Sequence, residues 1–243
     1  MLTSYLGSYD RVTASASSEW VLAIDTSAER AGVALWNGTA LHEMVWPSDR
    51  RQTTEAMSRI DDLLASADVD VREIVGVVVA QGPGTFTGLR VGMSIAKGLA
   101  IALGIPIAGV PTLDAIALPW AQANRSVVAM LAAGRGRLVW QSISPGGPSA
   151  IPVNGTPAEL LASLAGARPD AMVGELPVAL REALSGAAVP VLSEPGLTSR
   201  IGAIALLGAH RLRHGHADDL VTLEPLYVHG LSKTSRPVRD ARP

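Results

Sequence analysis

The run IVGVVVA at positions 74–80 constrains the fold more than any other part of the sequence. Apolar residues fill nearly every place in it, and most are β-branched, which is typical of a strand buried on both faces of a sheet. The turn QGPGTFTG follows at positions 81–88 and leads without a break into an apolar stretch with helical periodicity. A doubly covered strand that leads into a helix indicates a parallel sheet with helices on both faces, and so an α/β protein.

The chain shows one order of elements twice. In the first half, strands are expected at 20–25, 31–36, 40–46, 74–80 and 106–110, with helices at 50–67, at 88–104 and from Thr112. In the second half, strands at 126–132, 137–143, near Ile151, at 171–174 and at 189–192 precede or alternate with helices that begin at Thr156 and near Thr198. Thr156, Pro157 and Glu159 have the pattern of an N-cap, a first-turn proline and a capping box. Two βββαβαβα units predict two similar lobes that face a cleft.

The segment boundaries follow from composition. Residues 1–19 and 230–243 are expected to be a disordered leader and a disordered tail, with an N-terminal lobe at 20–123 and a C-terminal lobe at 124–229. The leader lacks the apolar core of a secretion signal. The longest uncharged apolar run, residues 98–113, contains two prolines and is too short to cross a bilayer. We therefore expect a soluble, cytoplasmic protein that does not contact a membrane.

Composition excludes several kinds of site. The 243 residues include no cysteine, which excludes disulfides, thiol nucleophiles and thiolate metal ligands. The formal net charge is −2, so any contact with nucleic acid has to be local or supplied by a partner. His210 and His214 have the spacing of a metal-ligand pair, but no motif places a third ligand, and a solvated helix end is the simpler interpretation. No metal site is predicted.

The glycine-rich turn does not match the common phosphate-binding motifs. A dinucleotide-binding turn has its third glycine where this chain has Thr87, and a Walker loop has a lysine where this chain has Leu89. Thr85 or Thr87 could cap the following helix, whose free N–H groups could still meet an anion. The alternative is a tight corner at which two backbone segments approach closely.

The helix after this turn is apolar nearly all round. Small residues recur every four positions in one row, at Gly88, Gly92, Ala96, Ala100 and Gly104, and a second small row contains Ser94, Gly98 and Ala102. Such a helix has to be covered on nearly every side. One side is expected to pack on the sheet. The first small row is predicted to lie against a second chain, with burial inside the monomer as the alternative.

Three segments of the sequence resemble the TsaB (YeaZ) family of bacterial proteins. They are VLAIDTSAERAGVALWNG, GPGTFTGLRVGMSIAKGLAIALGIPIAGVPTLDAIA and the late LEPLYV, and the likeness is good over about residues 20–143 and loose beyond them. Residues 82–92 are specific to this family and to its catalytic relative, TsaD. The turn at Asp25, Thr26 and Ser27 is shared more widely, by the actin, Hsp70 and sugar-kinase superfamily. The resemblance implies the two-lobed actin-like fold, built from duplicated RNase H-like units.

The resemblance also implies a non-catalytic subunit. Members of this family pair with TsaD, which carries the metal and performs the transfer, and the ATPase TsaE joins them to form threonylcarbamoyladenosine beside the anticodon of tRNA. No tightly bound cofactor is implied, and ATP or ADP would bind at the interface with TsaD. A homodimer is expected when the chain is alone, and tRNA is contacted only through the complex.

The same resemblance suggests where the sites lie. Asp25, Thr26 and Ser27 correspond to the first phosphate loop of the superfamily. The helices at 50–67 and 88–104 form the partner surface, with contacts expected from Met57, Ile60, Leu64, Leu89, Gly92, Met93, Ala96, Leu99 and Ala100. The family-motif turn comprises Gly82, Pro83, Gly84, Thr85, Phe86, Thr87, Gly88 and Arg90 and is expected mainly to set the angle of the interface helix.

Independent catalysis is disfavoured by the start of the second lobe. A kinase or ATPase of this superfamily needs a second acidic loop there to hold magnesium. This chain has Ala132 and Ala133 in that place, and it has Ala132 and Arg137 where the family usually has Asp-Ala-Arg followed by a glutamate. No catalytic residue is therefore predicted. The alternative is a stand-alone small-molecule kinase or ATPase that uses Asp25.

Overall fold

The computed structural model describes residues 19–48, 52–147, 150–164, 166, 168–192 and 199–228. The expected leader at 1–19, apart from Glu19, and the expected tail at 230–243 lie outside these described residues.

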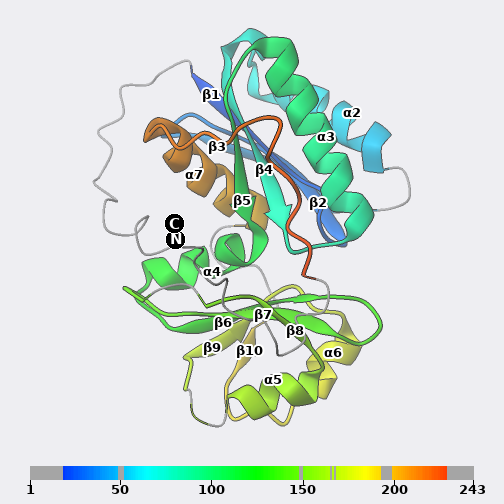
Figure 1. Cartoon of the computed structure of the whole chain (residues 1–243). Coiled ribbons are helices and arrows are strands. Elements are labelled where there is room, and N and C mark those ends of the chain that lie inside the picture. Colours follow the sequence, from blue (N-terminus) through cyan, green and yellow to red (C-terminus); the bar gives the residue numbers. More distant parts are fainter. Residues whose placement is uncertain are drawn as a thin grey trace, which may run out of the picture.

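The first sheet has five strands in the order β3-β2-β1-β4-β5 (Figure 1). Their bounds are β1 (Trp20–Asp25), β2 (Arg30–Trp36), β3 (Leu41–Pro47), β4 (Ile74–Gly82) and β5 (Ile107–Pro111). β1 pairs antiparallel with β2 and parallel with β4, and β4 pairs parallel with β5. A short 3-10 helix, η1 (Val71–Glu73), leads into β4. The apolar run at 74–80 is thus confirmed as an inner parallel strand.

Helices cover both faces of this sheet (Figure 1). α2 (Gln52–Ala67) and α3 (Phe86–Leu103) lie on one face, and α7 (Arg200–Arg213) lies on the other. Successive residues of β4 point alternately to these layers: Val77 packs with α2 and α3, whereas Val78 packs with α7. Both side chains are fully buried. Burial on two faces is what the unbroken apolar run predicts.

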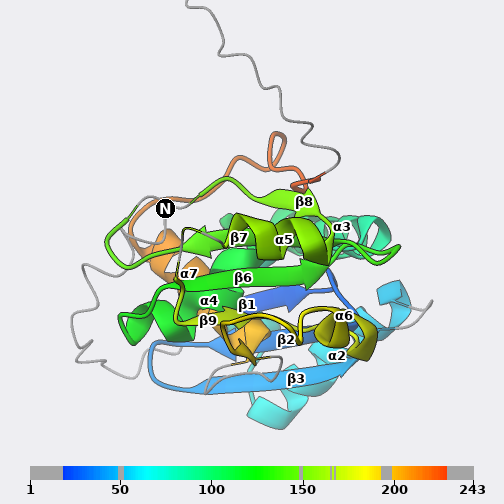
Figure 2. The same cartoon turned by 90° about the horizontal axis from the view of Figure 1, so that it is seen from below.

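The second sheet repeats the arrangement of the first. Its strands are β6 (Val127–Ala132), β7 (Leu138–Ile143), β8 (Val153–Gly155), β9 (Ala171–Val173) and β10 (Val191–Leu192), in the order β10-β9-β6-β7-β8. Counted from the first strand of each unit, this is the same order as in the first sheet, so the predicted duplicated topology is confirmed. α5 (Pro157–Ser163) and α6 (Val178–Ala183) lie on its outer face (Figure 2). The capping box of Thr156 and Glu159 at the start of α5 is also confirmed.

Two helices connect the lobes. α4 (Thr112–Gln122) lies between the sheets, where Leu113 and Ala117 pack with the second sheet and Leu118 packs with α7. α7 comes from the second half of the chain, yet its buried residues pack on strands β1, β2 and β4 of the first sheet. A helix from the second half of the sequence therefore completes the core of the first lobe. The boundary predicted near residue 123 remains a prediction.

The structure corrects the expected orientation of α3. In the first small row, Gly92 faces Thr26, and Ala96 and Ala100 are buried against the chain's own sheet. Four more of the expected partner contacts are buried in the same way: Ile60, Leu64, Leu89 and Met93. These side chains do not reach a partner, because the monomer already covers them. The second small row (Ser94, Gly98 and Ala102) is the exposed one, and Met57 on α2 is also exposed.

α3 is also the one helix among the described residues that is long and apolar enough to cross a membrane by length and composition alone. Core helices of soluble proteins meet the same test. Its packing against the first sheet accounts for its apolar composition here.

The close contact at the start of α3 can be tested with two glycine substitutions. A Cβ on Gly88 would overlap the carbonyl oxygen of Thr26, whereas a Cβ on Gly98 would meet nothing within 4 Å. We expect Gly88→Ala to lower the free energy of unfolding by about 1–3 kcal/mol, because a backbone oxygen cannot move aside. Gly98→Ala should raise it by about 0.5–1 kcal/mol, because alanine favours the helix. Urea unfolding measures both, and equal stability of the two variants would contradict this packing.

A buried carboxylate lies in the first turn of α4. Asp114 is 5% exposed, and its Oδ1 atom has no hydrogen-bond partner in the described structure. Burial raises the pKa of Asp114 from its ordinary value of 3.8 to about 6, although a hydrogen bond with Gln141 lowers it in part. The folded protein therefore binds a proton at Asp114 more tightly than the unfolded chain does.

This raised pKa predicts a pH-dependent effect of Asp114→Asn. The stability that protonated Asp114 supplies is present below about pH 4 and is lost as the pH rises through about 6. The variant should therefore gain stability over the wild type, by up to about 3 kcal/mol, between pH 4 and pH 8. Urea unfolding at both pH values measures the change. A constant difference would show that the carboxylate titrates normally.

Candidate functional site

A cavity of about 330 Å³ lies between the two lobes. Its wall includes Asp25 and Ser27 from the turn after β1, Ala132 from the end of β6, Glu175 from the segment after β9, and Arg200 from the start of α7. Of the three predicted phosphate-loop residues, Asp25 and Ser27 therefore face the cleft between the lobes, whereas Thr26 is not part of its wall. Whether these side chains are free to bind a ligand depends on the hydrogen bonds and ion pairs that they already make.

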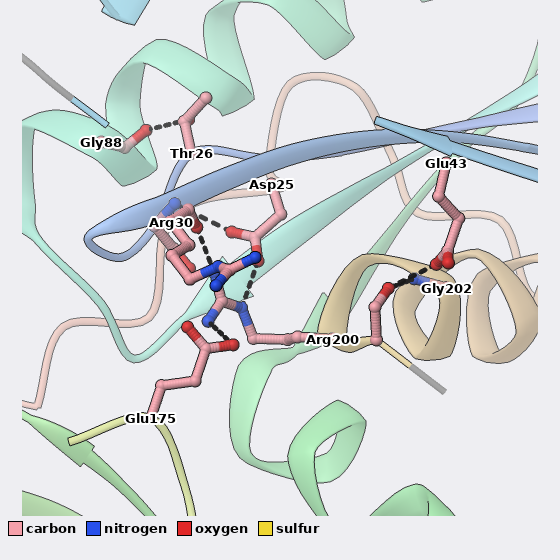
Figure 3. Close-up of polar contacts among 10 residues, drawn as sticks. Asp25, Thr26, Arg30, Glu43, Gly88, Glu175, Arg200 and Gly202 are labelled. Atoms are coloured by element: carbon pink, nitrogen blue, oxygen red, sulfur yellow. Dashed lines mark hydrogen bonds and ion pairs between the residues drawn. The ribbon is translucent and has the colours of Figure 1, made fainter. Parts of the chain in front are cut away.

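The Asp25 carboxylate is fully buried and already paired (Figure 3). Its Oδ2 accepts a hydrogen bond of 2.5 Å from Nε of Arg200, and its Oδ1 accepts one of 2.8 Å from the backbone N–H of Ser27. The Arg200 side chain is only 6% exposed. Both oxygens of Asp25 thus have donors from the chain itself, one of which carries a full positive charge.

Arg200 connects the two lobes. Its Nη2 donates to the carbonyl oxygen of Arg30 at 2.5 Å, and its Nη1 lies 2.7 Å from Oε1 of Glu175 (Figure 3). Burial opposes the charge of Arg200, but Asp25 and Glu175 outweigh that effect and raise the pKa of the guanidinium. The buried guanidinium thus has two carboxylate counter-charges and a carbonyl acceptor, although Nη1 makes only the ion pair with Glu175 and no hydrogen bond of standard geometry.

The start of α7 is fixed by a second contact. Ser199 is the N-cap residue, and its Oγ accepts a hydrogen bond of 3.1 Å from the backbone N–H of Gly202. The same hydroxyl donates to Glu43 of β3. An acidic residue near a helix N-terminus interacts favourably with the helix dipole, whereas Arg200 in the first turn does not. The cationic residue at this place is therefore held by its carboxylate partners.

The two predicted turns contact each other closely. Thr26 Oγ1 donates to the carbonyl oxygen of Gly88 at 2.6 Å, and the backbone N–H of Thr85 donates to the carbonyl oxygen of Ser27 at 2.6 Å. A Cβ on Gly84 would lie 2.5 Å from that same Ser27 oxygen. The glycines of the family-motif turn are needed because two backbone segments touch here. This supports the tight-corner interpretation over a phosphate loop.

The two positions at which the superfamily would hold a magnesium nucleotide do not both carry a free carboxylate. The acidic side chain of the first loop, Asp25, is bound to Arg200, and the second-lobe positions are Ala132 and Ala133. Magnesium prefers carboxylate and water ligands. Direct coordination by Asp25 would require a buried ion pair to break.

The remaining residues of the family-motif turn divide between the interior and the surface. Gly82, Pro83 and Gly88 are buried, whereas Phe86, Thr87 and Arg90 are exposed. The His210 and His214 rings stack at 4.1 Å, and burial followed by the nearby cationic groups lowers the pKa of His210. No group of three or more residues that could hold a metal occurs in the described part of the chain.

Sequence reasoning missed Arg200 and Glu175. Arg200 is 175 positions from Asp25, and no local pattern links the two. One signal was available: a cationic residue in the first turn of an apolar helix opposes the helix dipole and indicates an acidic partner.

The network predicts unequal effects of its two carboxylates. We expect Asp25→Ala to lower the free energy of unfolding by about 3–5 kcal/mol, because it leaves a buried guanidinium without its inner partner. Glu175→Gln should cost about 1 kcal/mol, because this partner is 28% exposed and the amide oxygen still accepts. Urea unfolding measures both. The double variant Asp25→Ala/Arg200→Met should recover part of the loss, and a further additive loss would contradict charge pairing.

Comparisons with known proteins agree with this fold and with the motif turn. The family model described as TsaD, tRNA N6-adenosine threonylcarbamoyltransferase, matches residues 46–164. A protein named "tRNA threonylcarbamoyladenosine biosynthesis protein TsaB" from Escherichia coli is 34% identical over 122 residues, which are 49% of this chain and 53% of that protein. The protein of the same name from Bacillus subtilis is 38% identical over 98 residues, or 40% and 43% of the two chains. The matched region thus spans about half the length of these relatives.

Solved structures match over more of the chain. A structure described as "YeaZ from Pseudomonas aeruginosa" has a TM-score of 0.70 at 23% identity, and it covers 86% of this chain and 100% of its own. A second, described as an uncharacterized protein with similarity to peptidase YEAZ from Pseudomonas aeruginosa, has a TM-score of 0.72 at 22% identity, with 87% and 100% covered. These two show the fold. The named relatives add that 40–49% of the chain is similar in sequence to proteins named TsaB.

Proposed function

We propose that this chain is the non-catalytic partner subunit of a complex that forms threonylcarbamoyladenosine in tRNA. The observation that carries the proposal is the 34% identity to a relative whose name states a role in threonylcarbamoyladenosine biosynthesis. The chain binds and activates a TsaD-type catalytic subunit, a TsaE-type ATPase joins the two, and the complex works in the cytoplasm. ATP or ADP binds at the interface with the TsaD-type subunit rather than in the cleft of this chain.

The cleft supports a non-catalytic role. The Arg200 guanidinium holds the carboxylate that a kinase or ATPase would use, and alanines stand where the second acidic loop would be. The rival function, a stand-alone small-molecule kinase or ATPase, would need both acids to position magnesium.

The exposed parts of α2 and α3 suit a partner surface. Ile101 is 68% exposed, Met57 is 38% exposed, and the small row of Ser94, Gly98 and Ala102 lies on the exposed side of α3. Small residues allow another helix to approach closely, and apolar neighbours supply the area to be buried. The contact surface therefore consists of these residues rather than of the buried row beside them.

Reconstitution tests the function directly. The chain is mixed with a TsaD-type subunit, a TsaE-type ATPase, ATP, threonylcarbamoyl donor and tRNA, and each protein is omitted in turn. Transfer should require this chain, while the chain alone should show at most traces of ATP turnover. ATP turnover by the chain alone that Asp25→Asn abolishes without unfolding the protein would support the rival function instead.

Substitutions on the exposed side of α3 test the partner surface. Gly98→Arg and Ile101→Glu should weaken association with the TsaD-type subunit by about 10- to 100-fold, because each places a charge or bulk in a contact that buries apolar area. Their melting temperatures should stay near that of the wild type, since both positions are exposed. Val178→Glu on α6, which is 58% exposed, is the matched control. Sedimentation shows the result, and unchanged association of both α3 variants would rule out this surface.

A further inference from the structure

The exposed face of α3 carries charge of one sign only. Arg90 and Lys97 are the charged residues of this helix, which contains no acidic residue. They are separated by two helical turns, about 10 Å along the axis, and therefore lie on the same side of the helix. Ser94, Gly98 and Ile101 are exposed on that side as well. A partner helix that packs on the patch at Gly98 and Ile101 and runs along α3 thus passes both cationic side chains.

Arg90 is exposed but already oriented. Its guanidinium carbon lies 3.9 Å from the centroid of the Phe86 ring, and its Nε donates to the Tyr227 hydroxyl at 2.9 Å. The Tyr227 ring packs on Phe86 in turn, with centroids 5.2 Å apart. In the described part of the chain, the two Nη atoms of Arg90 form no hydrogen bond or ion pair. A guanidinium held in this way loses little freedom when it pairs with a carboxylate of another molecule.

Lys97 likewise forms no ion pair with any residue that the structure describes. Asp219 feels its charge at longer range: hydrogen bonds with Thr222 and then with Val221 lower the pKa of Asp219, and the charge of Lys97 lowers it further. Asp219 is exposed, so water and salt screen this interaction. Both cationic groups of α3 are therefore available to a partner.

A second copy of α3 does not suit this face. Two α3 helices laid against each other, in either direction, would bring the cationic residues of one against those of the other, because neither helix offers an acid. Like charges that meet in a protein contact cost free energy and exclude the wrong partner. The charge of α3 therefore opposes a dimer in which the two α3 helices face each other.

The helix α2 of a second copy is also a poor match. Asp62 already pairs with Arg59 at 3.9 Å, and Oε2 of Glu55 is covered by the chain itself. Among the described residues of α2, Asp61 alone is an exposed acid without an ion pair. One carboxylate cannot pair with two cationic groups that lie two helical turns apart. The charges of α3 thus favour a different molecule.

We propose that Arg90 and Lys97 determine which partner α3 accepts: an acid-bearing helix of the TsaD-type subunit, rather than a second copy of this chain. This inference rests on the proposed function, because it names the charge pattern of the partner at the same surface. The partner helix carries two carboxylates about seven positions apart, which pair with Arg90 and Lys97. Small or apolar side chains between them pack on Ser94, Gly98 and Ile101. Charges beside an apolar contact contribute to partner choice more than to raw affinity.

The test measures the affinity of the full chain for the TsaD-type subunit by calorimetry at low and moderate salt. Arg90→Gln/Lys97→Gln should weaken association by about 5- to 30-fold at low salt, and its affinity should depend less on salt than that of the wild type. Arg90→Lys/Lys97→Arg should recover most of this loss, because both charges remain. Arg135→Gln/Arg168→Gln removes two exposed arginines of the second lobe and is the matched control, with nearly unchanged affinity expected.

Self-association of the chain alone is the second readout, and it needs no partner subunit. In sedimentation equilibrium, Arg90→Gln/Lys97→Gln should self-associate at least as tightly as the wild type, because the charges that it lacks repel one another between two α3 helices. Weaker self-association would overturn the inference, since a second copy would then supply the acids.

The two proposals fail in different ways. If Arg90→Gln/Lys97→Gln binds the TsaD-type subunit as tightly as the wild type while Ile101→Glu does not, the charge inference is wrong and the proposed function stands. If the wild-type chain does not associate with the TsaD-type subunit at all, both are wrong.

Discussion

The buried guanidinium of Arg200 is the constraint on which the arrangement of the two lobes depends. It is 6% exposed, and it contacts Asp25 of the first sheet and Glu175 of the second lobe. A charge in such a place is tolerated only with its counter-charges. The position of Arg200 therefore fixes the start of α7, and the rest of that helix covers the first sheet. A helix from the second half of the chain thus completes the first lobe, and its ion pairs with Asp25 and Glu175 lie in the wall of the cleft between the lobes.

Local patterns predicted the elements of this fold well. The doubly buried strand β4 follows from the run at 74–80, and the start of α5 follows from the capping pattern of Thr156 and Glu159, because each signal depends on neighbouring residues only. The contact between Arg200 and Asp25 could not be predicted in this way, since it joins residues 175 positions apart. The residues around a charged side chain in the sequence do not indicate which distant residue it will pair with.

The orientation of α3 shows why an apolar helix is harder to interpret. It has small residues in two rows, and periodicity alone does not say which row faces the sheet. In the structure, the row with Gly88 and Gly92 faces inward. The Thr26 hydroxyl donates to the carbonyl oxygen of Gly88, and it leaves no room for a side chain at Gly92. Gly88 and Gly92 of the buried row serve the contact with Thr26, whereas Ala96 and Ala100 pack against the sheet. The exposed row at Ser94, Gly98 and Ala102 has no such task in the monomer.

The ion pair with Arg200 engages the Asp25 carboxylate at the edge of the cleft. In an enzyme with this architecture, the acids after the first strands of the two units would hold a metal nucleotide between the lobes. Here Asp25 is bound to Arg200 and the second position is Ala132, so the same turns serve to position α3. The side chains left exposed on α3 lie outside the cleft: Phe86 and Arg90 in its first turns, and Gly98 and Ile101 further along. A single helix, oriented by the turn at residues 25–27, thus presents two separate exposed surfaces with different chemistry. The first is aromatic and cationic, because Arg90 stacks on Phe86, and the second is apolar and small, because it consists of Gly98 and Ile101.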